Sequence, residues 1–83
     1  MTYEIDWKEN AIKDLKKLEV SISNRIYKKV DELIENPCSK DIKKLKWVNA
    51  FRLRVGDYRV IFEIERDLIC ILKVGHRKNI YEK

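Results

Sequence analysis

Apolar and polar residues alternate between residues 51 and 62, a pattern that predicts two β-strands joined by a tight turn. The turn falls at Gly56 and Asp57, because glycine tolerates the backbone of a two-residue hairpin loop. Successive side chains of a strand point to opposite faces, so the apolar residues share one face and the arginines share the other. A two-residue turn also pairs Arg54 with Arg59 across the hairpin.

Three arginines therefore crowd one face of this two-stranded ribbon: Arg52, Arg54 and Arg59. Like charges directly opposite one another destabilise a β-ribbon. A small protein that keeps such a cluster is expected to use it to hold something polyanionic.

The first half of the chain is predicted to form a short strand and two helices. Residues 3–7 alternate as a strand does, and apolar residues follow at helical spacing over residues 8–19. Ser21 or Ser23 is expected to cap a second helix, which ends at Pro37 because proline cannot continue a helix. The predicted buried stripe of that helix is Ile22, Ile26, Val30, Leu33 and Ile34.

The second half continues as a basic connector, residues 40–46, followed by the arginine hairpin and a third apolar strand, residues 68–74. We predict one α+β domain, residues 1–83: an N-terminal strand, an antiparallel helical hairpin, then a three- to four-stranded antiparallel sheet. The helices are expected to pack on one face of that sheet.

The opposite face of the sheet combines arginines with an apolar strip. A two-residue turn at residues 66–67 pairs Ile61 with Leu72 and Arg59 with Val74. The strip consists of Ile61, Cys70 and Leu72. An amphipathic helix or segment of a partner protein would cover it, or else the last helix turn or a terminus of this chain folds over it. A shift of one residue in the register of these strands would exchange the side chains on the two faces of the sheet.

Positive charge is concentrated in the second half of the chain. The protein carries a formal net charge of +5. Residues 1–42 hold eight Lys and Arg against nine Asp and Glu, a balance of −1, whereas residues 43–83 hold eleven against five, a balance of +6. This distribution favours a nucleic acid or an acidic protein as partner. The alternative is the solvated surface of a lysine-rich protein.

Composition also bears on location and cofactors. Cys38 and Cys70 lie far apart without metal-type spacing, as is typical of reduced cysteines in a cytoplasmic protein. The N-terminus is polar and acidic, unlike a signal peptide. No apolar run approaches the ~20 residues of a membrane-spanning helix. We expect a cytoplasmic protein with no membrane contact, no metal ion and no cofactor.

The candidates for chemistry are basic and aromatic: Arg52, Arg54, Arg59, His76, Arg77 and Tyr81. Such a set suits metal-free cleavage of RNA, in which the 2′-hydroxyl attacks the adjacent phosphorus while the protein stabilises charge and manages two protons. Arginine binds phosphate well but is a poor general base, so the acid and the base stay unassigned. Ordinary alternatives remain: His76 as a surface residue, Tyr81 packed on a helix, and Arg59 paired with a nearby carboxylate.

These residues resemble the RelE/ParE superfamily, the toxins of prokaryotic type II toxin–antitoxin pairs. The resemblance covers nearly the whole chain and is most specific in residues 52–64, in the Val-Gly-His-Arg of residues 74–77, and in Tyr81. It implies the RelE-like fold. For the RelE-like branch it also implies metal-free cleavage of mRNA in the ribosomal A site, leaving a cyclic phosphate.

The resemblance assigns roles to individual residues. Arg59, Arg77 and Tyr81 match the two arginines and the tyrosine of the family's site. Arg52 and Arg54 fall where the best-studied branch has two lysines, which leaves proton transfer to another side chain or weakens the activity. We assign RNA binding to Lys43, Lys44, Lys46 and Lys78.

The resemblance further implies partners. A small RelB-like antitoxin would wrap an acidic, partly disordered segment over the basic face in a heteromeric complex, and the ribosome and mRNA would be the other partners. The apolar strip fits such a segment. Two alternatives stay open: a ParE-like toxin that inhibits DNA gyrase, and a catalytically weak member that only binds RNA or its antitoxin.

Overall fold

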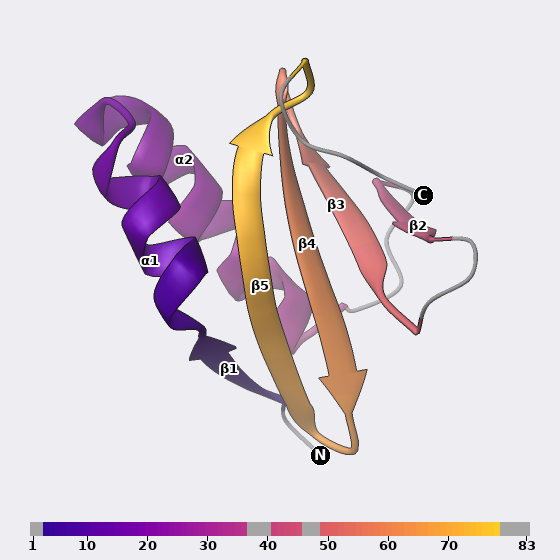
Figure 1. The fold of residues 1–83 in the computed structure, drawn as a ribbon. Helices are drawn as coiled ribbons and strands as arrows, with labels where there is room; N and C mark the ends of the chain where they lie inside the picture. The colour runs from indigo at the N-terminus through magenta and orange to yellow at the C-terminus, as the bar shows by residue number, and fades with distance from the viewer. Residues whose placement is uncertain (1–2, 37–40, 46–48, 79–83) are drawn as a thin grey trace.

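The computed structural model describes residues 3–36, 41–45 and 49–78, and Figure 1 shows two helices packed on one face of a sheet. In chain order the elements are β1 (Glu4–Trp7), α1 (Glu9–Lys16), α2 (Val20–Asp31), the 3₁₀ turn η1 (Glu32–Ile34), β2 (Ile42–Lys44), β3 (Phe51–Val55), β4 (Tyr58–Glu65) and β5 (Leu68–His76). The predicted α+β class is confirmed. None of the helices described is both long and apolar enough to cross a membrane.

The sheet has five strands in the order β1-β5-β4-β3-β2, where three or four were expected. β1 lies parallel to β5, whereas the other neighbouring pairs are antiparallel. The count is higher because part of the basic connector forms β2 and pairs with β3, and because β1 joins the opposite edge. The sheet is therefore mixed, and β4 lies at its centre.

The helical hairpin differs from the prediction at the start of α2. The N-cap is Glu19 and makes no side-chain cap hydrogen bond, so the predicted cap at Ser21 or Ser23 is wrong. Both serines lie inside the helix, and Ser23 Oγ donates to the carbonyl oxygen of Leu15 at 3.0 Å. A hydroxyl that bonds a preceding carbonyl ties the two helices together instead of capping backbone N–H groups. Pro37 lies outside the described residues.

The main core lies between the helices and the sheet. Phe62 on the central strand is fully buried, and its ring stacks on that of Phe51 with 5.5 Å between centroids. Burial of an aliphatic or aromatic side chain of this kind contributes about 1.5–3 kcal/mol, so these contacts fix the helices on the sheet. Of the predicted stripe, Ile26, Val30 and Leu33 are buried. The core cluster is Ala11, Leu15, Ile26, Val30, Leu33, Leu53, Val55, Val60, Phe62, Ile69, Ile71 and Val74.

A β-bulge in β5 changes the register on the face opposite the helices. Phe62 faces Ile71, whereas Ile61 faces Lys73, so Leu72 is an extra residue of β5. The predicted pairing of Ile61 with Leu72 is therefore wrong. A bulge of this kind leaves one residue of the longer strand unpaired and increases the local twist.

The bulge decides which side chains of β5 enter the core. Without it, Lys73 would lie opposite Val60 on the core side, and Arg59 would face Val74 as predicted. With it, Val74 faces Val60 and both are buried, while Arg59 faces Gly75. The predicted pairing of Arg59 with Val74 is wrong because burying a valine is favourable, whereas burying a lysine charge is costly.

A carboxylate on α1 supports this register. β1 ends opposite Ile71, and among the described residues no strand pairs with this edge of β5 beyond that point. The backbone N–H of Val74 donates there to Asp14 Oδ2 at 3.0 Å, across 60 residues of sequence. Asp14 therefore joins α1 to β5 just after the bulge.

Replacing Asp14 with Ala removes the acceptor of the Val74 N–H. We expect the free energy of unfolding to fall by about 1–3 kcal/mol, because a partly buried donor loses its partner. Urea denaturation followed by circular dichroism measures this loss. Glu9→Ala is the matched control, since Glu9 lies on the same helix in an exposed ion pair with Lys13, and its removal should change stability by less than about 0.5 kcal/mol. Equal losses in the two variants would contradict the role of Asp14.

Candidate functional site

The arginine hairpin formed by β3 and β4 has the register that alternation predicts. Both expected pairs across the turn, Val55 with Tyr58 and Arg54 with Arg59, are present. Gly56 has φ +59, a left-handed conformation that residues with a Cβ adopt only with strain. The glycine therefore permits the tight turn that brings the two arginines face to face.

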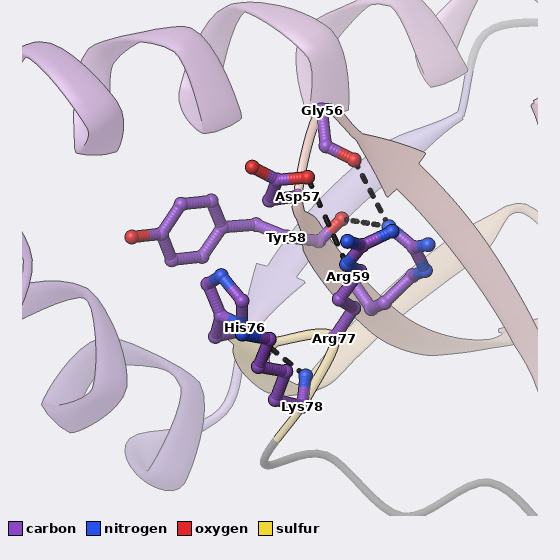
Figure 2. A network of polar contacts seen from close by, with 7 residues as sticks. All are labelled: Gly56, Asp57, Tyr58, Arg59, His76, Arg77 and Lys78. Atoms are coloured by element: carbon purple, nitrogen blue, oxygen red, sulfur yellow. Dashed lines mark hydrogen bonds and ion pairs between the residues drawn. The ribbon is translucent and has the colours of Figure 1, made fainter.

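Arg59 is fixed to the turn by backbone carbonyl groups. Its Nη1 donates to the carbonyl oxygens of Gly56 and Tyr58, each at 3.0 Å. Figure 2 shows the guanidinium group held against the turn by these two bonds. The N–H groups of Nε and Nη2 remain to donate to a ligand, since guanidinium carries five donors in a planar fork. The turn thus orients an arginine before any ligand arrives.

Arg77 reaches the same turn from the end of β5. Its backbone N–H donates to the carbonyl oxygen of Asp57 at 2.8 Å, and its Nε lies 3.8 Å from Asp57 Oδ1. The two side chains are 57% and 67% exposed, so their ion pair contributes little to stability. The main-chain bond places the residue, and the guanidinium group stays accessible near Arg59 (Figure 2).

Arg52 and Arg54 lie further along β3 on the face that carries Arg59. Arg54 is exposed and faces Arg59 directly, whereas Arg52 is half-buried and faces Ile61 on one side and Lys43 on the other. Arg52 lies two residues, or roughly 7 Å, further from the turn than Arg54. Arg54, Arg59 and Arg77 therefore gather at the hairpin end, and Arg52 lies behind them.

His76 lies on the helix-facing side of the sheet, away from the arginines. It faces Tyr58 across β4 and β5, and the two rings meet edge to face with 5.3 Å between centroids. Its Nδ1 accepts a hydrogen bond from the backbone N–H of Lys78 at 3.2 Å. His76 therefore lies on the same side as Tyr58, and the structure does not bring it into the arginine cluster. Arg77 is the first residue after β5 and is placed by its main-chain bond to Asp57.

The lysines assigned to RNA binding are spread along two edges of the site. Lys43 and Lys44 are exposed on the edge strand β2, and Lys78 follows β5. Lys46 and Tyr81 lie outside the described residues.

The apolar strip next to the arginines is largely buried. Ile61 is 8% exposed and Cys70 is 7% exposed, and only Leu72 is half-buried. Ile61 forms a small second cluster with Ala50, against which Leu45 and Leu72 pack. The strip therefore presents far less apolar surface to a partner than the sequence led us to expect.

Sequence reasoning missed two features of the site. One is Asp57, which anchors Arg77 through its carbonyl oxygen and its carboxylate. The other is a pair of cations on α2, Arg25 and Lys28, which line a groove beside the turn. Their spacing of three residues places them on one helix face. Nothing local in the sequence indicates that this face looks toward the hairpin.

The arrangement supplies positive charge and hydrogen-bond donors for a phosphate group. Arginine keeps its proton at all ordinary pH values, so the proton acceptor for any reaction has to be another group. Within the described ranges, no three His, Cys, Asp or Glu side chains come together as metal ligands.

The amino-acid sequence is similar to those of known toxins. A family model described as the ParE toxin of the type II toxin–antitoxin system, parDE, matches residues 5–81. The chain is 40% identical over 76 residues to Toxin RelE3 of Methanocaldococcus jannaschii, and the match covers 86% of each protein. It is 26% identical over 82 residues to the mRNA interferase toxin RelE of Escherichia coli K12, covering 94% of this chain and 86% of that protein.

Solved structures show the same fold. A chain of the archaeal RelE–RelB complex from Pyrococcus horikoshii superimposes with a TM-score of 0.82 at 30% identity, covering 96% of this chain and 100% of the other. A chain of the RelB–RelE antitoxin–toxin complex from Methanococcus jannaschii gives a TM-score of 0.74 at 38% identity, covering 92% and 94%. The protein belongs to the RelE/ParE superfamily of type II toxins, in its RelE-like branch.

Proposed function

We propose that the protein is a ribosome-dependent, metal-free mRNA endonuclease, the toxin of a type II toxin–antitoxin pair. The observation that carries the proposal is the fixation of Arg59 and Arg77 at one turn, by backbone bonds that leave donor groups of both guanidiniums available. The naming of similar proteins as mRNA interferases supports the same reading.

The proposed reaction is an internal transesterification. The 2′-oxygen of the RNA bonds to the adjacent phosphorus as its proton leaves, and the bond from phosphorus to the 5′-oxygen breaks as that oxygen gains a proton. The products are a 2′,3′-cyclic phosphate and a free 5′-hydroxyl. Negative charge grows on the non-bridging oxygens, and fixed cations stabilise it most when they need not reorganise.

The position of each arginine suggests which part of the RNA it would bind. Arg59 has its Nη1 committed to the turn, so its remaining donors point in a set direction toward a phosphate. Arg77 approaches from β5 and would bind the same phosphate from a second side. Arg54 and Arg52 would hold the flanking backbone. Tyr81 and His76 remain the candidates for proton transfer, with His76 the less direct because it faces the helices.

Binding of the rest of the RNA would use the charge around this centre. Lys43 pairs with Arg52 and extends the positive surface onto the edge strand β2, and Lys78 extends it beyond β5. Lys44 pairs with Phe51, so it is exposed on the other side of the same strand. Lys46 stays assigned to RNA binding, although it lies outside the described residues. Such contacts bind the RNA backbone without reading its sequence.

We also propose a RelB-like antitoxin as partner, in a heteromeric complex. Structures of similar toxins were solved as RelB–RelE complexes, which supports a partner of that kind. An acidic segment would neutralise the arginine face. Of the residues assigned to this contact, Leu72 offers accessible surface, whereas Ile61 and Cys70 are already buried.

A gyrase-inhibiting, ParE-like toxin is the second candidate, and the description of the matching family model favours it. That activity requires binding to a protein and no phosphate chemistry. A role for the fixed pair of arginines therefore distinguishes the two candidates.

Replacing Arg77 with Ala should abolish most cleavage while leaving the fold intact. We expect the rate to fall roughly 100- to 1000-fold, the usual loss when one transition-state donor is removed. A translation reaction with purified protein, with mRNA ends mapped by primer extension, measures the cleavage. Arg66→Ala is the matched control, because Arg66 carries the same charge in the exposed turn at the far end of β4 and β5.

Unchanged cleavage by the Arg77→Ala variant would refute the role given to that residue. If the unsubstituted protein leaves mRNA intact but inhibits supercoiling by purified DNA gyrase, the ParE-like function replaces the nuclease.

Arg59→Lys separates charge from geometry. Lysine keeps the positive charge but lacks the planar fork that binds two carbonyls and a phosphate together. We expect cleavage to slow by about 10- to 100-fold, which corresponds to one or two charge-assisted hydrogen bonds. Affinity for a non-cleavable RNA should stay within about twofold at low salt, because the charge is unchanged. Unchanged cleavage would show that Arg59 acts only through its charge, and a parallel loss of affinity and rate would show that its hydrogen bonds serve RNA binding alone.

A further inference from the structure

A groove of about 390 Å³ lies beside the arginine hairpin, between α2 and the end of β3. The residues that line it are Arg25, Lys28, Lys29, Glu32, Asp41, Arg54, Val55 and Gly56. Four of these eight are cations and two are acids. No local pattern in the sequence indicates the groove, because its two walls are brought together only by the packing of α2 on the sheet.

The charges of the groove do not cancel. Lys29 Nζ lies 3.2 Å from Asp41 Oδ2 and 3.9 Å from Glu32 Oε1, so both acids face the same lysine. Within the part of the chain that the structure describes, no ion pair involves Arg25 or Lys28. The groove therefore keeps a net positive charge.

The groove is continuous with the arginine cluster. Gly56 lines it, and the carbonyl oxygen of the same glycine accepts a hydrogen bond from Arg59. Nη2 of Arg25 lies 3.3 Å from the point that a Cβ on Gly56 would occupy, so this guanidinium reaches the hairpin turn from the helix side. Arg54 lines the groove and faces Arg59. One turn thus separates two sets of cations.

We infer that this groove, through Arg25 and Lys28, binds backbone phosphates of the RNA strand that the arginine cluster cleaves, at nucleotides next to the cleaved bond. The inference rests on the proposed function. A strand that passes over the Gly56 turn would meet Arg59 on one side and Arg25 on the other. Arginine matches phosphate geometry with two parallel hydrogen bonds, and lysine adds a mobile charge.

The lining favours phosphates over an acidic protein segment. Val55 is the one aliphatic side chain among the eight described lining residues, and it is itself buried. A disordered segment that folds on binding has to bury apolar surface to offset its loss of entropy. A nucleic acid backbone needs only charge and donors, which the groove supplies.

The test is the salt dependence of RNA binding. The probe is a short single strand with 2′-O-methyl riboses, which cannot be cleaved because the attacking hydroxyl is blocked. We would compare the unsubstituted protein with the double variant Arg25→Gln, Lys28→Gln by fluorescence anisotropy over a series of salt concentrations. Each lost phosphate contact makes the slope of log K against log salt less negative by about 0.7, so we expect a change of about 1.4.

Two further variants keep the result interpretable. Lys13→Gln, Lys16→Gln removes the same charge from an exposed face of α1, where neither residue lines the groove, and should leave the slope unchanged. Arg25→Lys keeps the charge and should keep the slope. Thermal unfolding of each variant confirms that it is folded, which is expected because the substituted side chains are exposed.

A slope for the groove variant equal to that of the unsubstituted protein would overturn the inference, even if mRNA cleavage is intact. If that equal slope comes with weaker binding to ribosomes, the groove binds ribosomal RNA instead. If it comes with weaker binding to a polyglutamate peptide, the groove binds an acidic protein. Failure of the unsubstituted protein to bind the probe at any salt concentration would overturn the inference alone, because a ribosome-dependent nuclease need not hold free RNA; the proposed function stands or falls with mRNA cleavage in the translation reaction.

Discussion

The register of β4 against β5 is the constraint on which the site depends. The extra residue at Leu72 brings Val74 into the core opposite Val60, and the rest of β5 follows from that placement. Gly75 then faces Arg59, and the chain leaves β5 with Arg77 bonded to Asp57. A shift of one residue in this register would move Arg77 away from its main-chain bond with Asp57. The core thus sets the position of the arginines.

The arginine cluster carries an electrostatic cost that the fold offsets only in part. Arg54 and Arg59 face each other across the hairpin, which destabilises a two-stranded ribbon. Two carbonyl oxygens of the turn accept hydrogen bonds from Arg59 and partly offset its charge. The carboxylate of Asp57 partly offsets the charge of Arg77. A bound polyanion would remove the remaining repulsion and stabilise the folded protein by mass action. The charge that weakens the free protein is therefore the charge that would bind its ligand.

What the sequence predicts well is local. The hairpin depends on alternation and on one glycine, so its register follows from residues 51–62 alone. The position of the bulge does not follow from nearby residues. It is selected by the burial of Val74 in place of Lys73, and by a hydrogen bond from Val74 to Asp14, 60 residues away in the sequence. The same limit applies to His76, whose face depends on the bulge, and to the α2 groove, which exists only once the helix packs on the sheet. Similarity to a known family recovered the fold but could not supply these tertiary details.

The burial of the apolar strip changes how a protein partner would bind. Ile61 and Cys70 already belong to the interior, so the arginine face offers a partner mainly charge and the exposed edge of β2. In the proposed function, the antitoxin and the RNA would then depend on the same cations, and their binding would be mutually exclusive. Both interactions would weaken with salt, since exposed charges are screened over about 8–10 Å at ordinary ionic strength. An antitoxin that relies on this face has to gain its remaining affinity elsewhere, from main-chain pairing at a sheet edge or from contacts with the helices.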